Sequence, residues 1–579
     1  MDAHKEPLSK ILSLPTRLVA PLFQRPYVWK REDNWEPLWE AMLEVLDRRV
    51  KGDKPRPYFM GAIVLDKAFG GIGAIPSREI IDGQQRMTTL QIMLEVAKRL
   101  FQAEGFSFAA TQLAHLTRND VDPEADPDSE HQFKVWPTNI DRDPFRKVMT
   151  GQKAGGLMQE ASEFFESQIA TWLKPTNEGA KERAGAFVQA VNHDLVFVAI
   201  DLTDEDDDGQ LIFETLNALG TPLLPSDLVK NLLFREAIAQ KLNTEKLYAD
   251  HWRQFEEDAH YWRHKVKVGR RERPRVDVFL QHYLTLNLNK EPNLAHQFRE
   301  YREALREGKV GSVSDAMADL SNHAGRFRGF DEATDGAQGS FRALLRVLDL
   351  TVPTPLVLGI LSNCEDPASR DAMLSILESY FVRRFLCAWT NKNYNLVVLS
   401  LIAHCKRSGW TPITLREALQ SFDGASNSWP TDSDVIGRIT QKHSYGDIRS
   451  TGIAYVLSRV EASMRTAKSE APWNLNTELT VEHIMPRRWE PNWPLDPDTE
   501  DAKRRRYEIV DRMGNLTVLT QALNSSVSNA CWAEKRNHLS AHSVLRMNNE
   551  LAKHESWSEV DVEIRGAQLA LQFCELWPR

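Results

Sequence analysis

Short apolar runs alternate with one long stretch of helical spacing in the N-terminal part of the chain. Residues 58–66 (YFMGAIVLD) are apolar and partly β-branched, and 79–81 (EII) have the same character, so both predict buried strands. Apolar side chains then recur every three or four residues across 84–101, which predicts a helix. Asp82 and Gly83 stand between strand and helix and predict a strand–turn–helix junction.

The same mixture continues further along the chain and then gives way to helices. Residues 195–202 (LVFVAIDL) predict another strand, and Pro225 predicts the start of a helix. From about 245 to 435 the apolar spacing is almost entirely helical. Short β-like runs then return at 479–481 and 516–519, among polar turns and helices. The pattern as a whole predicts an α+β protein that is mostly helical.

Chain length and these changes of pattern together predict three domains. At roughly 150 residues per domain, 579 residues suffice for three or four. We place the boundaries so that the domains span residues 1–245, 246–435 and 436–579.

Composition and charge narrow the class of protein. The chain is 42% hydrophobic and 26% charged, as globular proteins are. Its net charge of −9 argues against a protein that coats nucleic acid by bulk charge, so any anion site must be local. The five cysteines form no CxxC pair and indicate neither a disulfide framework nor a structural zinc site. Because no long apolar run is present, we expect a cytoplasmic protein without a membrane partner.

The C-terminal β-like runs carry residue types that suit a nuclease. Glu482 and His483 end the first run, Asn515 precedes the second, and Asn524 follows it. Phosphodiester cleavage needs a base that deprotonates water and a divalent cation near the leaving oxygen. A neutral imidazole suits the first task. Carboxylate and carboxamide oxygens suit Mg²⁺.

The order of these four side chains resembles the HNH nuclease motif, a ββα-metal fold. The resemblance makes His483 the general base and Asn515 the residue that orients its imidazole through its side chain or its backbone. It makes Glu482 and Asn524 the ligands of Mg²⁺ or Mn²⁺. Several HNH families carry Asp at the position of Glu482, so the resemblance supports the role of His483 more strongly than that of Glu482.

Two basic segments are candidates for contact with DNA. The run Lys503, Arg504, Arg505 and Arg506 lies between the two halves of the nuclease motif, where a duplex must pass, so we expect it to contact the DNA backbone. Residues 262–275 contain seven Lys or Arg and one Glu. For this second segment, DNA contact and a merely solvated surface are open alternatives.

The turn at Asp82 and Gly83 predicts a phosphate site. A glycine turn that opens a helix leaves unpaired N–H groups and the positive end of the helix dipole facing outward. Arg86 would add a bidentate contact, and Gln84 or Gln85 would position a water or a ribose. Asp82 would hold Mg²⁺ between phosphates, or would serve only as a helix cap.

Three N-terminal stretches together resemble the N-terminal domain of the GmrSD restriction family: 23–29 (FQRPYVW), 82–90 (DGQQRMTTL) and 213–231. Residues 380–387 (YFVRRFLC) and 391–395 (NKNYN) match its helical continuation. The HNH region is similar to the family's C-terminal nuclease domain. The resemblance implies a ParB-like, nucleotide-binding N-terminal domain with a helical extension. It places the nucleotide on Asp82, Gly83, Gln84, Gln85, Arg86, Thr88, Glu214, Asn217, Asp227 and Lys230.

The resemblance also implies an activity. We expect a modification-dependent DNA endonuclease or nickase of anti-phage defence, in which hydrolysis of an NTP, GTP or ATP, regulates the HNH domain. Within the family the chain looks most like the SspE effectors of phosphorothioate-dependent systems. Relatives that act on glucosylated or methylated cytosines are an open alternative. Two further alternatives are open: an N-terminal half that binds DNA without catalysis, and a nuclease directed at RNA. The chain could also assemble into a homo-oligomer.

The loop FQRPY is the expected reader of the DNA modification. Pro26 excludes a helix interior and biases Arg25 toward an extended backbone, so Gln24 and Arg25 lie on a loop or an edge. The family resemblance places Phe23, Gln24, Arg25, Pro26 and Tyr27 at the sensing surface. There an arginine would meet a DNA phosphate, while the ring and proline faces would accept a less polar group such as sulfur.

Overall fold

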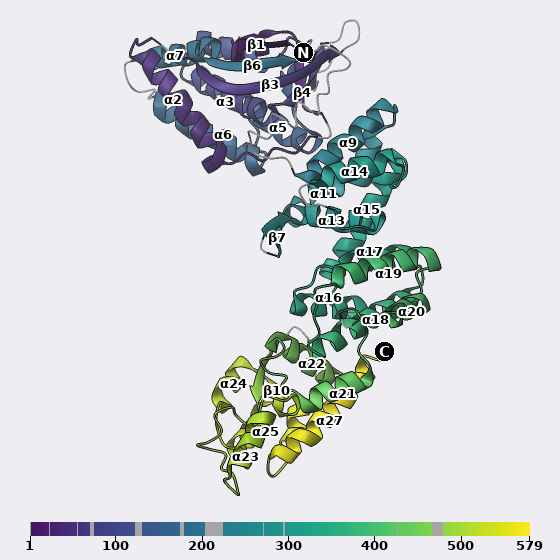
Figure 1. The fold of residues 1–579 in the computed structure, drawn as a ribbon. Coiled ribbons are helices and arrows are strands. Elements are labelled where there is room, and N and C mark those ends of the chain that lie inside the picture. Colours follow the sequence, from purple (N-terminus) through teal and green to yellow (C-terminus); the bar gives the residue numbers. More distant parts are fainter. Residues whose placement is uncertain are drawn as a thin grey trace. The chain divides into compact units, whose positions relative to one another are not determined.

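A computed structural model describes most of the chain and divides it into two compact units, Met1–His264 and Lys265–Arg579 (Figure 1). The described residues are 2–21, 24–54, 56–69, 75–121, 130–173, 179–202, 224–269, 271–292, 296–424, 426–465 and 479–579. The boundaries of the three domains given above stay a prediction.

A six-stranded mixed sheet with the order β1-β6-β3-β4-β2-β5 is the centre of the first unit (Figure 1). β3 runs parallel to β6 and antiparallel to β4, and β2 runs parallel to both of its neighbours. The strands are β1 (Asp2–Pro7), β2 (Arg17–Val19), β3 (Tyr58–Phe69), β4 (Ser77–Asp82), β5 (Val135–Trp136) and β6 (Leu195–Asp201). The strands expected at 58–66, 79–81 and 195–202 are thus confirmed.

Helix α3 (Gln84–Ala103) is deeply buried in this unit, and the sequence pattern predicted it. All residues from Met87 to Ala97 are buried, in one core with side chains of the sheet. Each fully buried Leu, Ile or Met contributes about 1.5–3 kcal/mol, so the core fixes where α3 begins, directly after β4. The other helices up to residue 193 are α1 (Leu8–Ser13), η1 (Arg31–Trp35), α2 (Glu36–Val50), α4 (Ser107–Thr117), η2 (Glu130–Gln132), η3 (Asn139–Asp141), α5 (Arg142–Met149), α6 (Gly156–Leu173) and α7 (Ala180–His193).

Short helices complete the first unit. Pro225 stands at the first position of α9 (Pro225–Ala239), as its fixed φ favours, and the carboxylate of Asp227 accepts the backbone N–H of Leu224. The expected helix start at Pro225 is confirmed. The elements that follow are α10 (Thr244–Leu247), η4 (Tyr248–Trp252), α11 (Arg253–Glu257) and α12 (Ala259–Trp262).

The second unit begins with a β-hairpin and continues with helices, as the spacing predicted. The hairpin strands are β7 (Lys265–Val268) and β8 (Arg271–Pro274). The helices are α13 (Arg275–Leu288), α14 (Gln297–Arg306), α15 (Val313–Glu332), α16 (Gly336–Leu348), α17 (Thr354–Asn363), α18 (Pro367–Leu386), α19 (Tyr394–Ser408), α20 (Pro412–Gln420), α21 (Asp432–Gln441) and α22 (Ser450–Ser463).

Two antiparallel strands and five helices form the C-terminal part of this unit among the described residues. β9 (Leu479–His483) pairs with β10 (Leu516–Thr520), so the strands expected at 479–481 and 516–519 are confirmed. The helices are α23 (Glu500–Ile509), α24 (Gln521–Val527), α25 (Trp532–His542), α26 (Arg546–Leu551) and α27 (Glu559–Leu576), with a short turn η6 (Met513–Asn515) before β10. The α+β, mostly helical fold class is confirmed. None of the helices in the described ranges is long and apolar enough to cross a membrane.

A buried arginine of the YFVRRFLC segment holds the loop before α21. The guanidinium of Arg384 donates to the carbonyl oxygens of Thr390, Ser426 and Ser428 at 2.7–2.8 Å. We expect Arg384→Met to lower the free energy of unfolding by about 3 kcal/mol or more, because these carbonyls lose their donors inside the protein. Urea denaturation checks this, with Arg407→Met on the exposed face of α19 as the control. Equal midpoints for the two variants would contradict it.

Candidate functional sites

The end of β9 presents Glu482 and His483 to different surroundings, because neighbouring side chains of a strand point to opposite faces. The carboxylate of Glu482 accepts a hydrogen bond from Nζ of Lys535 on α25 at 2.5 Å. The imidazole of His483 lies 2.9 Å, Nε2 to Oδ1, from Asp511. The two adjacent residues are therefore held by separate elements.

Asp511 is the centre of the group around His483. Its carboxylate also meets Nε of Arg487 at 3.3 Å, and its backbone oxygen accepts the N–H groups of Ser444 and Tyr445. The ring of Tyr445 packs edge-on against the imidazole, with 4.6 Å between ring centroids. Burial alone would raise the pKa of Asp511, but the hydrogen bond and charge of His483, together with Arg487, bring it below its usual value. Asp511 is thus an anion and a hydrogen-bond acceptor at neutral pH.

The protonation of Asp511 decides which imidazole nitrogen is free. A carboxylate can only accept hydrogen bonds, so Nε2 of His483 carries the hydrogen that points at Asp511. Nδ1 then holds the lone pair, and it has no hydrogen-bond partner among the described residues. This arrangement makes Nδ1 the atom that can take a proton from water.

Asn515 does not touch the imidazole of His483. Its buried carboxamide accepts the N–H of Met485 and donates to the carbonyl oxygens of Met485 and Val510, at 2.8–2.9 Å. Of the two expected ways in which Asn515 orients the imidazole, the side-chain contact is corrected, because Asp511 makes it. The backbone oxygen of Asn515 does accept the N–H of Ile484, the residue after His483, at 2.8 Å. Asn515 instead fixes the backbone that follows His483 and the backbone that precedes Asp511.

Glu482 and Asn524 offer oxygen ligands on one face of the strand pair. The side-chain Nδ2 of Asn524, on α24, donates to Oγ1 of Thr480 at 2.8 Å, and Thr480 shares its strand face with Glu482. This orientation leaves Oδ1 of Asn524 and Oε2 of Glu482 without a hydrogen-bond partner among the described residues.

The ligand set fits an ion that keeps most of its waters. The described part of the chain contains no group of three or more His, Cys, Asp and Glu placed to hold a metal. One carboxylate and one carboxamide oxygen suit Mg²⁺, which binds few protein groups and retains several waters. Glu482 and Asn524 are therefore the residues that would hold it.

The basic run on α23 is already occupied by acidic partners. Arg506 is buried, donates to the carbonyl oxygen of Trp493 and pairs with Glu559 at 2.6 Å. The expected DNA contact is corrected for Arg506, since a DNA phosphate cannot reach a buried guanidinium. The other three members, which stay predictions as DNA contacts, form ion pairs on the surface: Lys503 with Asp498 and Glu500, Arg504 with Asp501, and Arg505 with Glu563.

In the first unit, the loop after residue 23 lies against the turn that opens α3. Gly83 has a φ of +99°, which glycine adopts without strain, and it sets the direction of α3 after β4. The carboxamide of Gln84 donates to the carbonyl oxygen of Arg25 at 2.9 Å. That of Gln85 donates to the carbonyl oxygen of Pro26 and accepts the N–H of Val28. The two stretches predicted separately, DGQQR and QRPY, thus form one site.

Two residues expected at a sensing surface are buried instead. The hydroxyl of Tyr27 lies 2.7 Å from Oγ1 of Thr89 and accepts the indole N–H of Trp35. Burial raises the pKa of Tyr27 far above its usual value. Gln24 is 4% exposed and donates to the carbonyl oxygens of Ile80 and Ile81. Gln24 and Tyr27 therefore anchor the loop, and the expectation that they read DNA is corrected.

Lys230 also serves the loop. Its ammonium is 1% exposed, forms an ion pair with Glu256 and donates to the carbonyl oxygen of Gln24 at 3.1 Å. Tyr248 donates to the second oxygen of Glu256 at 2.6 Å. Because the buried ammonium is already paired inside the protein, the expected role of Lys230 as a nucleotide ligand is corrected to one of support.

Arg25 is the loop side chain with freedom to bind a ligand. Burial lowers the pKa of its guanidinium, while the charges of Asp227 and Asp82 oppose that shift. Among the described residues its side chain has no hydrogen bond or ion pair. Asp227 itself pairs with Arg263 at 2.9 Å.

Asp82 and Arg86 flank the opening of α3. Burial raises the pKa of Asp82, and Arg86, 3.8 Å away, opposes this. Arg86 also donates to the carbonyl oxygens of Met60 and Ala62. Thr88 is buried one turn further along α3. The remaining expected site residues, Phe23, Glu214 and Asn217, lie outside the described residues.

A buried carboxyl beneath the loop predicts a pH effect on stability. Asp141 accepts the N–H of Tyr27 and the hydroxyl of Thr138, and burial raises its pKa to about 6. Between about pH 4 and pH 6 the folded protein keeps this proton while the unfolded chain loses it, so this group lowers stability as the pH rises. We expect Asp141→Asn to stabilise the protein by about 1–3 kcal/mol at pH 7 and to flatten the change between pH 4 and 6.

Unfolding titrations from pH 4 to 8 check this effect. The exposed acid Asp143 gives the matched control, Asp143→Asn, which should leave the pH profile unchanged. A profile for Asp141→Asn that coincides with that of the unmodified chain would refute the assignment.

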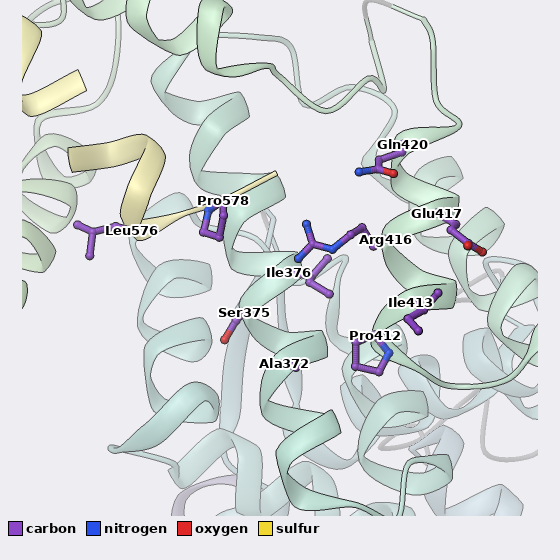
Figure 2. A pocket seen from close by; sticks show the side chains of 10 residues that line it. All are labelled: Ala372, Ser375, Ile376, Pro412, Ile413, Arg416, Glu417, Gln420, Leu576 and Pro578. Carbon is purple, nitrogen blue, oxygen red and sulfur yellow. The ribbon is translucent and has the colours of Figure 1, made fainter. Parts of the chain in front are cut away.

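A cavity of about 490 Å³ lies apart from both sites, between α18, α20 and the C-terminal residues (Figure 2). Its lining includes Ile376, Ile413, Arg416 and Pro578. None of the expected site residues lines it, so it is not a candidate for either activity.

Two family models match the chain. That of the N-terminal domain of the GmrSD restriction endonucleases matches residues 8–234, and that of the C-terminal domain matches 429–571. Together they cover more than half of the chain. The chain belongs to the GmrSD restriction endonuclease family. It is therefore a modification-dependent restriction endonuclease whose partner is DNA. No curated protein matches it.

Each GmrSD match contains one of the two sites. The N-terminal match includes the loop and the opening of α3, and the C-terminal match includes β9, β10 and α24. The likeness of this GmrSD protein to SspE effectors stays a prediction.

Three residues that contact the candidate nuclease site were not predicted from the sequence. Asp511 stands four positions before Asn515, and Tyr445 lies in a loop far from the motif. Lys535 lies on α25, beyond the four residues that carried the predicted motif. The carboxylate close to Asn515 along the chain was the available signal for Asp511, whereas no local signal marks Tyr445.

Proposed function

We propose that this GmrSD protein nicks or cleaves modified DNA with the group around His483. The pairing of His483 with Asp511 carries the proposal. Asp511 holds the hydrogen on Nε2, so Nδ1 accepts a proton from the attacking water. The water oxygen forms the new bond to phosphorus, and the bond to the leaving oxygen breaks. A divalent cation on Glu482 and Asn524 would neutralise the charge on that oxygen.

The test of this site uses matched DNA duplexes. Nicking assays with Mg²⁺ or Mn²⁺ would compare unmodified, phosphorothioated, glucosylated and methylated substrates. We propose phosphorothioated DNA as the preferred substrate, with modified cytosines as the alternative. His483→Ala should lose about 10²–10⁴-fold in rate, as loss of a general base does. The proposal would be refuted if His483→Ala nicked DNA as fast as the wild-type chain. It would also be refuted if the wild-type chain cleaved RNA with no requirement for a DNA modification.

We propose further that the opening of α3 binds a nucleoside triphosphate, GTP or ATP, whose hydrolysis regulates cleavage. The free N–H groups at the start of a long helix favour phosphate, and Asp82 and Arg86 flank this point. The alternative is that the turn grips a DNA phosphate and the domain is an adaptor. A nucleotide titration without DNA distinguishes the two.

Arg25 is the proposed reader of the modification. Arg25→Ala should keep basal NTP turnover and lose its stimulation by modified DNA, because the loop stays anchored through Gln24 and Tyr27. Turnover assays with and without phosphorothioated duplex check this result. An Arg25→Ala protein that modified DNA stimulates fully would remove Arg25 from recognition.

A further inference from the structure

The hairpin of β7 and β8 carries an unpaired positive charge. Lys265, Lys267 and Arg271 are exposed and Arg273 is half-buried. None of these four has an ion-pair partner among the described residues. The one acid on the two strands, Glu272, stands directly across from Lys267. The strands therefore have a net positive charge in a chain whose net charge is −9.

The arginines on either side of the hairpin, unlike those on its strands, form ion pairs among the described residues. Arg263 pairs with Asp227 at 2.9 Å, and Arg275 pairs with Asp331 at 3.5 Å. The seven basic residues of this segment are thus not equivalent. The flanking arginines are used inside their own units, while those on the strands remain available.

Both faces of the hairpin are basic. The register pairs Lys265 with Pro274 and Val266 with Arg273, and paired residues share a face. The lysines of β7 therefore lie on one face and the arginines of β8 on the other. No strand of the described chain pairs with this hairpin, which leads directly into α13 (Figure 1). A lone two-stranded hairpin is marginally stable in water, and each face of this one carries two cations, on alternate residues of one strand.

A polyanion would neutralise the cations on both faces. We infer that the β7–β8 hairpin binds duplex DNA through its phosphate backbone. The major groove of B-DNA is about 12 Å wide and admits a two-stranded ribbon, so cations on both faces would meet the two strands that border the groove. The inference rests on the proposed function only in taking DNA as the substrate.

The test measures binding of a DNA duplex by the full chain at several salt concentrations. The variant Lys265→Gln, Lys267→Gln, Arg271→Gln, Arg273→Gln should bind at least about tenfold more weakly at 0.1 M salt, with a salt slope reduced by about 3–4. A control with four exposed cations replaced elsewhere keeps the same total charge: Lys309→Gln, Arg326→Gln, Lys392→Gln, Arg407→Gln. It should bind as the unmodified chain does.

A variant with the opposite change in charge distinguishes a loss of DNA contacts from a loss of folding. Glu272→Gln removes the single acid of the strands and should tighten DNA binding, which damage to the fold would not do. Unchanged affinity and salt slope in the fourfold variant would overturn the inference while leaving cleavage by His483 standing. The inference would also be overturned if the fourfold variant lost only its binding of single-stranded RNA and still bound the DNA duplex. Absence of DNA binding and nicking in the unmodified chain would instead refute the proposed function.

Discussion

Asp511→Asn should lower the rate of DNA nicking by about 10²-fold or more while leaving DNA affinity unchanged. Asparagine presents an N–H as readily as an oxygen, so it no longer requires the hydrogen on Nε2 of His483. The base then loses its defined lone pair on Nδ1, and general-base catalysis of this kind contributes about 10²–10⁴-fold. Single-turnover nicking with saturating enzyme separates this rate effect from binding.

The fold around Asp511 should survive this substitution. Ser444 and Tyr445 bind its backbone oxygen, which the substitution leaves in place. Arg487→Ala is the control, because this exposed side chain meets the same carboxylate and should cost less than about tenfold. The double variant His483→Ala, Asp511→Asn should be no slower than His483→Ala alone, since Asp511 acts through the imidazole. Additive losses would assign Asp511 a separate role.

Asp82→Asn should lower NTP turnover by about 10²-fold or more and leave the fold intact. The amide keeps the size of the carboxylate but cannot hold a magnesium ion between phosphates as an anion does. The carboxylate is also buried beside Arg86, so neutralising it removes a desolvated charge and keeps the packing. Steady-state hydrolysis of GTP and ATP checks the loss.

An exposed acid of the same unit provides the comparison for Asp82. The Asp53→Asn variant should hydrolyse NTP at the rate of the wild-type chain. Normal turnover by Asp82→Asn would move the nucleotide site elsewhere. Nucleotide binding without any turnover in the unmodified chain would favour the adaptor alternative.

The sequence predicted elements that depend on local pattern. The strands that carry Glu482 and His483, the helix that begins at Gln84 and the loop character of Arg25 all follow from spacing and from proline and glycine chemistry. Each of these features is decided within about ten residues along the chain.

Partners that are distant along the chain could not be predicted in this way. Lys230 meets the backbone of Gln24, and Tyr27 meets Thr89, through contacts that only the folded chain brings together. Arg506 looks like its basic neighbours in the sequence, yet it is the one that points inward. Polar residue types alone do not say whether a side chain faces a ligand or another part of the protein.

The hydrogen bonds from Gln84 and Gln85 to the loop have a thermodynamic consequence. They join the opening of α3 to the backbone of Arg25 and Pro26, so a ligand that displaces the helix opening must disturb the loop. Linkage between two such ligands is reciprocal: the factor by which DNA changes the affinity for a nucleotide is the factor by which the nucleotide changes the affinity for DNA. If modified DNA tightens nucleotide binding tenfold, the nucleotide will hold the enzyme on modified DNA tenfold more tightly.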